Sequence, residues 1–109
     1  MDRLQAIADW PALIAKARYC VKTLARNCGT SVSTLRNFFH QYFKIAIKKW
    51  LEKLRLCEFK FRLRLGERIK EFFAVLGYHD AAHASHDFKH AFGLTPREWK
   101  KRFAKRRAT

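Results

Sequence analysis

The sequence predicts an all-α fold, and three observations support that prediction. Among 109 residues there are only four Gly and two Pro, which leaves few positions for turns and loops. Hydrophobic residues make up 49% of the chain, and many of them recur three or four apart, as on one face of a helix. The sequence also repeats itself, because a shift of 49 positions lays Phe39 on Phe88 and Trp50 on Trp99. Two related helical halves are therefore expected.

The first half opens with two short helices. Asp9 followed by Pro11 is typical of a helix start, because the carboxylate can accept from free N–H groups of the first turn and proline costs no hydrogen bond there. This helix is expected to run to about Arg18. A second helix is expected over Val21–Asn27, with Gly29 closing it.

Ser31 is the next capping residue, and it predicts a helix over Val32–Phe43. The inward face of this helix is expected to hold Leu35, Phe38, Phe39 and either Tyr42 or Phe43. A supporting helix, a glycine turn and a polar-capped second helix form the unit that a helix-turn-helix motif requires.

The longest uninterrupted helical pattern is Ile47–Leu65, which contains neither Gly nor Pro until Gly66 breaks it. At about 1.5 Å per residue it spans about 28 Å, close to the approximately 34 Å repeat of B-DNA. Its apolar residues form two stripes: Ile47, Trp50, Leu51, Leu54, Cys57 and Phe61 in one, and Leu56, Phe59 and Leu63 in the other. Two stripes indicate a linker helix that contacts both halves.

The second half repeats the pattern of the first. A supporting helix is expected over Arg68–Leu76, and Gly77 ends it. Asp80 then caps a recognition helix over Ala81–Phe92, which Gly93 closes. The inward residues of this half are expected to be Ile69, Phe72, Phe73, Leu76, Ala81, Ala84, Phe88 and Phe92.

A last helix follows the second repeat. Thr95-Pro96-Arg97-Glu98 matches a capping box, in which Thr and Glu satisfy each other's backbone N–H groups. Trp99 and Phe103 are expected to face inward, before a basic tail at residues 105–107 that either contacts phosphates or is a solvated end. The expected divisions are a first helix-turn-helix subdomain over 1–46, the linker helix over 47–65, and a second subdomain with the last helix and tail over 66–109.

The charge balance indicates a polyanionic partner. Lys and Arg number 24 against nine Asp and Glu, a formal net charge of +15. With two helix-turn-helix patterns, this excess favours double-stranded DNA. There is no run of 18 apolar residues and no signal-peptide core, so we expect a cytoplasmic protein without a membrane partner. The three cysteines are widely spaced and form no Cys-x-x-Cys pair, which argues against a disulfide framework or a Cys-only metal site.

Residues of one pattern are spread over both halves of the chain. They are Leu24, Ala25, Gly29, Ser31, Leu35, Phe39, Arg55, Leu56, Gly77, Tyr78, Asp80, Phe88, Lys89, Phe92, Gly93, Thr95, Pro96 and Trp99. This pattern resembles the DNA-binding domain of AraC/XylS-type transcription regulators from about Leu13 to Arg102. Its most specific part is the Phe-Gly-x-Thr-Pro run at residues 92–96.

The resemblance implies a seven-helix domain in which a rigid helix joins two helix-turn-helix lobes. Both recognition helices would then enter successive major grooves on one face of a bent duplex. It further implies an activator that contacts RNA polymerase, and in many members a separate effector-binding or dimerisation domain. Two recognition helices in one chain remove the geometric need for a dimer, so we expect a monomer.

The sequence departs from the family in its core and turns. Members usually carry a small residue at Phe59 and Phe73, an aromatic residue at Ala84 and a glycine at Lys44. We interpret Ala84 together with the two Phe residues as an exchange of volume within the second core.

The motif positions also imply which residues meet DNA. Base contacts are expected from Ser33, Thr34, Arg36 and Asn37 in the first recognition helix, and from Ala82, His83 and His86 in the second. Arg36 can bond guanine and Asn37 adenine, whereas Ala82 offers only a methyl, so the second helix should discriminate less. Phosphate contacts are expected from Lys22, Thr23, His40, Lys48, Lys49, Ser85, Lys89, His90 and Arg97.

The histidines of the second half stand at regular spacings. His79, His83, His86 and His90 lie four, three and four apart, which places them along one helical side. Pairs four apart also occur in zinc sites, but no second segment offers a partner, so we expect no metal and no other cofactor. A mild pH effect on DNA binding is expected instead, because imidazole gains charge near neutrality.

We therefore predict a sequence-specific, double-stranded-DNA-binding transcription regulator of AraC type that is an activator. The alternative is a protein that keeps the fold but binds DNA or RNA nonspecifically, with weakened base readout. An enzyme is not expected, because the sequence has no Gly-rich phosphate loop and no nucleophile-and-base arrangement with a supporting motif.

Overall fold

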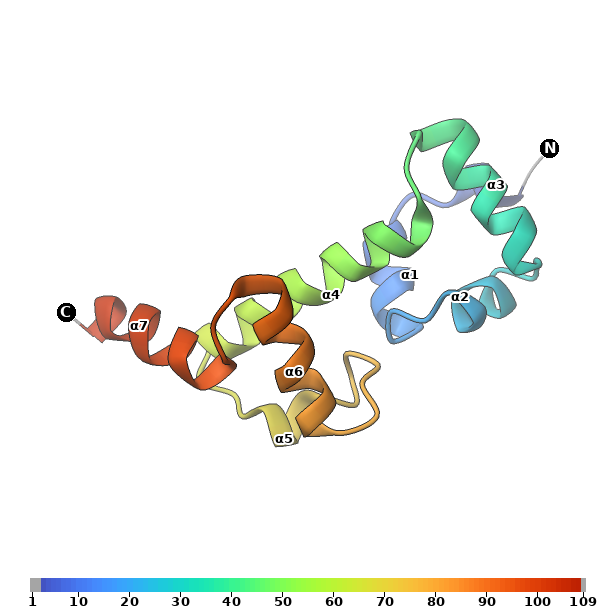
Figure 1. Cartoon of the computed structure of the whole chain (residues 1–109). Helices are drawn as coiled ribbons and strands as arrows, with labels where there is room; N and C mark the ends of the chain where they lie inside the picture. The colour runs from blue at the N-terminus through green and yellow to red at the C-terminus, as the bar shows by residue number, and fades with distance from the viewer. Residues whose placement is uncertain (1–2, 109) are drawn as a thin grey trace. The chain divides into compact units, whose positions relative to one another are not determined.

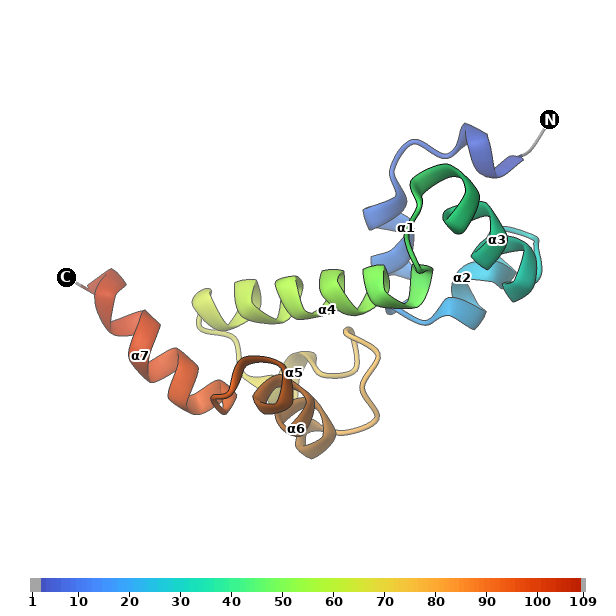
Figure 2. The ribbon, with the colours of Figure 1, turned by 45° about the horizontal axis from the view of Figure 1, so that its top comes forward.

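The computed structural model describes residues 3–108, and the side chains of residues 4–103. This part of the chain is helical and contains no β-strand. Its elements are a short 3-10 helix η1 (Arg3–Ala6) and the α-helices α1 (Trp10–Lys16), α2 (Val21–Asn27), α3 (Val32–Phe43), α4 (Ile47–Arg64), α5 (Ile69–Phe72), α6 (Ala81–Phe92) and α7 (Pro96–Ala108). Figures 1 and 2 show them along the chain. None of the helices within residues 3–108 combines the length and the apolar character that crossing a bilayer requires.

The chain divides into two units, Met1–Arg55 and Leu56–Thr109, and the division falls inside α4. The first unit therefore holds η1, α1, α2, α3 and the first half of α4. The second unit holds the rest of α4 with α5, α6 and α7.

The core of the first unit is aromatic. Phe39 of α3 is fully buried, and its ring lies 4.7 Å from the ring of Trp10 and 5.3 Å from that of Trp50. The predicted inward residues Leu35, Phe38 and Phe39 are confirmed as buried. Tyr42 and Phe43 touch the rings of Phe38 and Phe39 but remain 49% and 46% exposed.

In the first unit, a long-range hydrogen bond joins α4 to the turn after α1. Arg18 and Tyr19 both adopt left-handed conformations after α1, with φ of 55° and 59°. The guanidinium Nη2 of Arg55 in α4 donates to the carbonyl oxygen of Tyr19 at 3.1 Å. The bond links two residues 36 positions apart, and it provides a donor for the carbonyl of this turn.

The core of the second unit is built around Phe59. Its ring is fully buried and lies 4.7 Å from Phe88 and 5.4 Å from Phe72. Ala84 of α6 is also fully buried. A large residue on α4 and a small one on α6 thus occupy the same core, as the proposed exchange of volume requires.

The four predicted caps are confirmed. Ala12 N–H donates to Asp9 at 3.1 Å, Thr34 N–H to Ser31 at 3.1 Å, and His83 N–H to Asp80 at 2.7 Å. At α7 the capping box is complete, with Thr95 N–H donating to Glu98 at 2.9 Å and Glu98 N–H to Thr95 at 3.1 Å. These local hydrogen bonds explain why α1, α3, α6 and α7 begin at the residues that the sequence predicts.

The prediction for the first α4 stripe is wrong in its second half. Cys57 and Phe61 were expected to be inward, but both are exposed, Phe61 at 54%. In the second unit α4 instead buries Phe59 and Leu63. Residues two apart point to opposite sides of a helix, so burying Phe59 leaves Cys57 and Phe61 outside.

Two predicted helix lengths are also corrected. The supporting helix expected over residues 68–76 is α-helical only at Ile69–Phe72. Beyond it, Leu76 N–H bonds Phe73 O and Gly77 N–H bonds Ala74 O, a three-residue winding that aligns Phe73 with the buried Leu76. The last helix, in contrast, extends to Ala108 instead of stopping before the basic tail, because no Gly or Pro follows Pro96.

Candidate nucleic-acid interface

In the first unit, α2 and α3 form a helix-turn-helix that presents α3. The two helices pack against each other, and Gly29 with a φ of 70° makes the turn between them (Figure 1). Leu24 and Leu35, one from each helix, have no exposed surface. One side of α3 is therefore held by the core while the other faces solvent.

The solvent side of α3 carries the predicted base-contacting residues. Ser33, Thr34, Arg36 and Asn37 are all exposed, and so is His40 one turn further on. Ser31 Oγ donates to Thr34 Oγ1 at 2.9 Å, which ties the Thr34 hydroxyl to the start of the helix. The structure thus gathers one guanidinium, one amide and two hydroxyl groups on one exposed face, the group types that bond base edges and phosphates.

In the second unit, α5 and α6 form the equivalent motif. They pack against each other, and Gly77 makes the turn with a φ of 87° (Figure 2). Phe72 of α5 and Phe88 of α6 are buried. Tyr78 in the turn is also buried, and its hydroxyl donates a short hydrogen bond to the carboxylate of Asp87 in α6. This bond ties the turn to the middle of the recognition helix.

The solvent side of α6 carries fewer strong hydrogen-bonding groups than the solvent side of α3. Ala82, His83 and His86 are exposed, whereas Ser85 is half-buried. The His83 ring meets the ring of Tyr78 edge-on at 5.5 Å, so a buried residue restrains the imidazole. The exposed face of α6 therefore offers a methyl and imidazoles, which bond base edges less strongly than a guanidinium does.

The residues predicted at phosphates lie at helix starts and on the flanks of the recognition helices. Lys22, Lys48, Lys49, Lys89, His90 and Arg97 are exposed. Thr23 is only half-exposed. Hydrogen bonding from Thr23, first of all from its backbone, lowers the pKa of the Cys20 thiol at the start of α2.

One exposed cation was not among the predicted phosphate contacts. Lys70 is exposed in the first turn of α5. A shift of 48 positions, the offset that lays Gly29 on Gly77, lays Lys22 on Lys70. Lys70 is thus the counterpart of a predicted phosphate contact, and applying the duplication residue by residue could have found it.

The histidines do not form a metal centre in the described part of the chain. Among residues with described side chains, no group of three or more His, Cys, Asp or Glu is placed to hold a metal ion. His79, His83, His86 and His90 are all exposed. They are therefore open to solvent and to a polyanion.

Comparisons with known proteins agree with this geometry. A family model described as a helix-turn-helix domain matches residues 24–102. The HTH-type transcriptional activator RhaR of Mannheimia succiniciproducens is 35% identical over 77 residues, which cover 70% of this chain and 28% of that protein. RhaR of Yersinia pseudotuberculosis is 35% identical over 71 residues, 64% of this chain and 24% of that protein. The matched part thus spans about a quarter of these relatives.

A solved structure has the same fold. It is a transcriptional regulator of Chromobacterium violaceum, described among AraC-type DNA-binding domain-containing proteins. The TM-score is 0.62 with 23% sequence identity, over 83% of this chain and 84% of that one. At this level of sequence identity, the similarity shows a shared fold.

Proposed function

Because this chain belongs to the AraC/XylS family of helix-turn-helix DNA-binding domains, we propose that it is a sequence-specific activator that inserts α3 and α6 into successive major grooves of double-stranded DNA. Membership of this family itself indicates a DNA-binding transcription regulator. The observation that supports specificity is the exposed pair Arg36 and Asn37 on a helix whose other side is buried.

Base readout is assigned to α3 in the first place. Arg36 donates two hydrogen bonds to guanine O6 and N7, and Asn37 pairs with adenine N6 and N7, each discriminating by about 1–3 kcal/mol. Ser33 and Thr34 add hydroxyl contacts. On α6, Ala82 contacts a thymine methyl or nothing, and His83 and His86 supply weaker readout.

Affinity that does not depend on sequence is assigned to the cations around the two helices. These are Lys22, Lys48, Lys49, Lys89 and Arg97, with help from His40, His90, Thr23 and Ser85. Each neutralised phosphate releases counterions, so the affinity falls steeply with salt. Half-burial of Thr23 and Ser85 makes them the weakest members of this set.

The role as an activator is taken from the relatives, which are named transcriptional activators. An activator acts through RNA polymerase, and we propose that this protein contacts it. We also propose that the protein acts as a monomer on its DNA in the cytoplasm. An effector-binding or dimerisation domain, as many family members have, would supply regulation.

The test is selection of bound duplexes from a random-sequence pool with the 109-residue chain. We expect one motif with two blocks about one helical turn, 10–10.5 base pairs, apart, with the α3 block more strongly restricted. The selected duplex and a scrambled duplex of equal length are then compared in gel shifts at physiological salt. Equal affinity for the two would replace this proposal with nonspecific nucleic-acid binding.

A further inference from the structure

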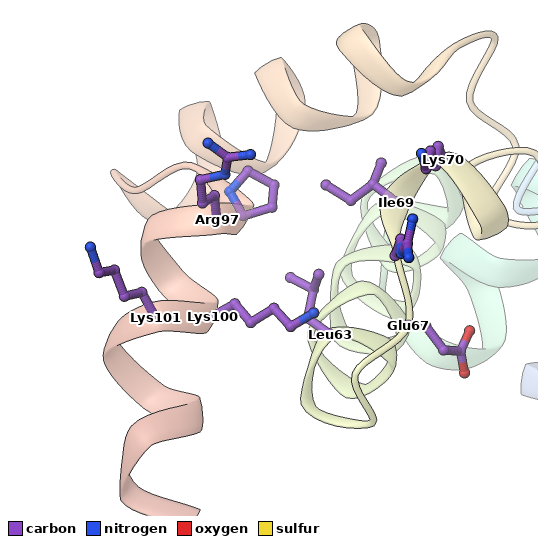
Figure 3. A pocket seen from close by; sticks show the side chains of 9 residues that line it. Leu63, Glu67, Ile69, Lys70, Arg97, Lys100 and Lys101 are labelled. Atoms are coloured by element: carbon purple, nitrogen blue, oxygen red, sulfur yellow. The ribbon is translucent and has the colours of Figure 1, made fainter.

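The second unit contains an open pocket of about 770 Å³ that is not part of the recognition helix. It lies between the start of α7, the start of α5 and the end of α4 (Figure 3). Its size falls within the range of about 300–1,000 Å³ that is usual for small-molecule sites. Its lining residues are Leu63, Glu67, Arg68, Ile69, Lys70, Pro96, Arg97, Lys100 and Lys101.

The pocket combines apolar and cationic surface. Leu63 and Pro96 are buried beneath it and Ile69 is half-buried, so its floor is hydrocarbon. Lys100 is half-buried and extends from α7 across the opening toward Leu63 (Figure 3). An ammonium group beside a hydrocarbon floor favours a ligand that has an anionic group at one end of an apolar body.

The charge of the lining is not balanced from within the pocket. Five of the lining side chains are Lys or Arg, and Glu67 is the only acid among them. Glu67 is already bound to Arg62 Nη1 at 2.9 Å and points away from the pocket (Figure 3). Arg62 lies outside the lining and bonds Glu58 as well, also at 2.9 Å. These two ion pairs, Arg62–Glu58 and Arg62–Glu67, involve neither Arg97 nor Lys100.

We propose that this pocket binds a small amphipathic carboxylate, with the carboxylate on Lys100 and the hydrocarbon body on Leu63, Ile69 and Pro96. The rival occupant is a phosphate of DNA, because Lys70 is the counterpart of Lys22. A phosphate would use the cations but would leave the apolar floor uncovered. The floor is thus the observation that favours the organic anion over the phosphate.

The experiment titrates the full chain, labelled with ¹⁵N, with three probes in the absence of DNA. Octanoate carries both a charge and an apolar body, 1-octanol carries the body alone, and inorganic phosphate carries the charge alone. Octanoate is expected to shift the amide signals of Ile69, Lys70, Arg97 and Lys100 saturably. Octanol and phosphate are expected to bind at least about tenfold more weakly, since each lacks one of the two interactions.

Variants identify the two parts of the site. Lys100→Met keeps the hydrocarbon stem and removes the charge, so it should weaken octanoate binding about tenfold and leave octanol unchanged. Ile69→Ser should weaken both octanoate and octanol. Lys53→Met, on the exposed side of α4 in the other unit, is the matched control and should change neither.

Three outcomes would overturn the proposal: no saturable shift with octanoate, phosphate binding as tightly as octanoate, or Lys100→Met retaining full octanoate affinity. Unchanged thermal unfolding midpoints of the variants exclude loss of fold as the cause of weak binding. The measurement contains no DNA, so its failure leaves the proposed function standing.

Discussion

The two helix-turn-helix units share a scaffold and differ in what they expose. Phe39 and Phe88 are repeat equivalents, and both are fully buried at the centre of an aromatic cluster. On the outer face of α3, Arg36 corresponds to the half-buried Ser85 of α6, and Asn37 corresponds to the exposed His86. The buried positions have kept their character while the exposed positions have changed theirs. The duplication therefore separates residues that maintain the fold from residues free to determine specificity.

The units also differ at the end of the recognition helix. Both helices end in the left-handed region, at Lys44 with a φ of 55° and at Gly93 with a φ of 78°. Glycine adopts this conformation without steric cost, whereas lysine does not. The first unit therefore carries backbone strain that the second avoids.

The largest expected effect concerns the shared core. Phe39→Ala and Phe88→Ala should each lower the free energy of unfolding by about 3–5 kcal/mol, because each leaves a cavity among rings that cannot close it. Urea unfolding followed by circular dichroism measures this. Phe61→Ala, at a residue 54% exposed, is the control and should change stability by less than about 0.5 kcal/mol. Comparable losses in all three variants would contradict the described core.

The next effect concerns the exposed faces. On the selected duplex, Arg36→Ala should lose about 1–3 kcal/mol of binding free energy, because a two-bond contact with guanine disappears. The equivalent change Ser85→Ala should lose little, since Ser85 is half-buried and carries no charge. Fluorescence anisotropy with selected and scrambled duplexes distinguishes the two. Equal weakening on both duplexes by Arg36→Ala would assign Arg36 to phosphate instead.

A third pair of variants tests the helix ends, with opposite signs expected. Lys44→Gly should stabilise the chain by up to about 1 kcal/mol by relieving the left-handed conformation. Gly93→Ala should destabilise it by about 1 kcal/mol, and by strain alone, because no atom lies within 4 Å of the added Cβ. Thermal unfolding of both variants provides the measurement. A destabilised Lys44→Gly would mean that the lysine side chain stabilises more than the strain costs.

The smallest effect concerns the capping box of α7. The hydrogen bond from the backbone N–H of Thr95 lowers the pKa of Glu98, so the carboxylate is favoured in the folded state. The stabilisation is therefore present above the unfolded pKa of Glu98 and is lost as the pH falls through the lower folded value. Glu98→Gln keeps the cap without the titration, so its unfolding midpoint should decline slightly less than that of the parent chain between pH 6 and pH 3. Identical declines would assign the acid sensitivity to other carboxylates.

Local signals in the sequence predicted the helices that begin at caps. Ser31, Asp80 and Thr95 each bond a backbone group three residues ahead, which is a property of neighbouring residues alone. The end of α5 could not be predicted in this way, because the tighter winding after Phe72 depends on how Phe73 and Leu76 pack. Which residues of α4 are buried could not be predicted either. The periodicity of the sequence shows two apolar stripes on this helix, but it does not show which stripe packs into the core of each unit.

The candidate site shows the same limit. The exposed residues of α3 and α6 followed from the pattern, because the inward face of an amphipathic helix defines the outward one. The half-burial of Thr23 and Ser85 did not follow, since it depends on how neighbouring side chains pack against them. The pocket beside Lys100 could not be predicted either, because its floor joins Leu63 and Ile69 to Pro96, which lies on a separate segment of the chain.

The bond from Arg55 to the Tyr19 carbonyl has a consequence for biosynthesis. A nascent chain emerges from the ribosome N-terminus first, and its domains generally fold as units in that order. The turn at Tyr19 obtains this donor only after 36 further residues have been added. The turn at Tyr19 in the first half therefore reaches its final form only when translation has passed the middle of α4.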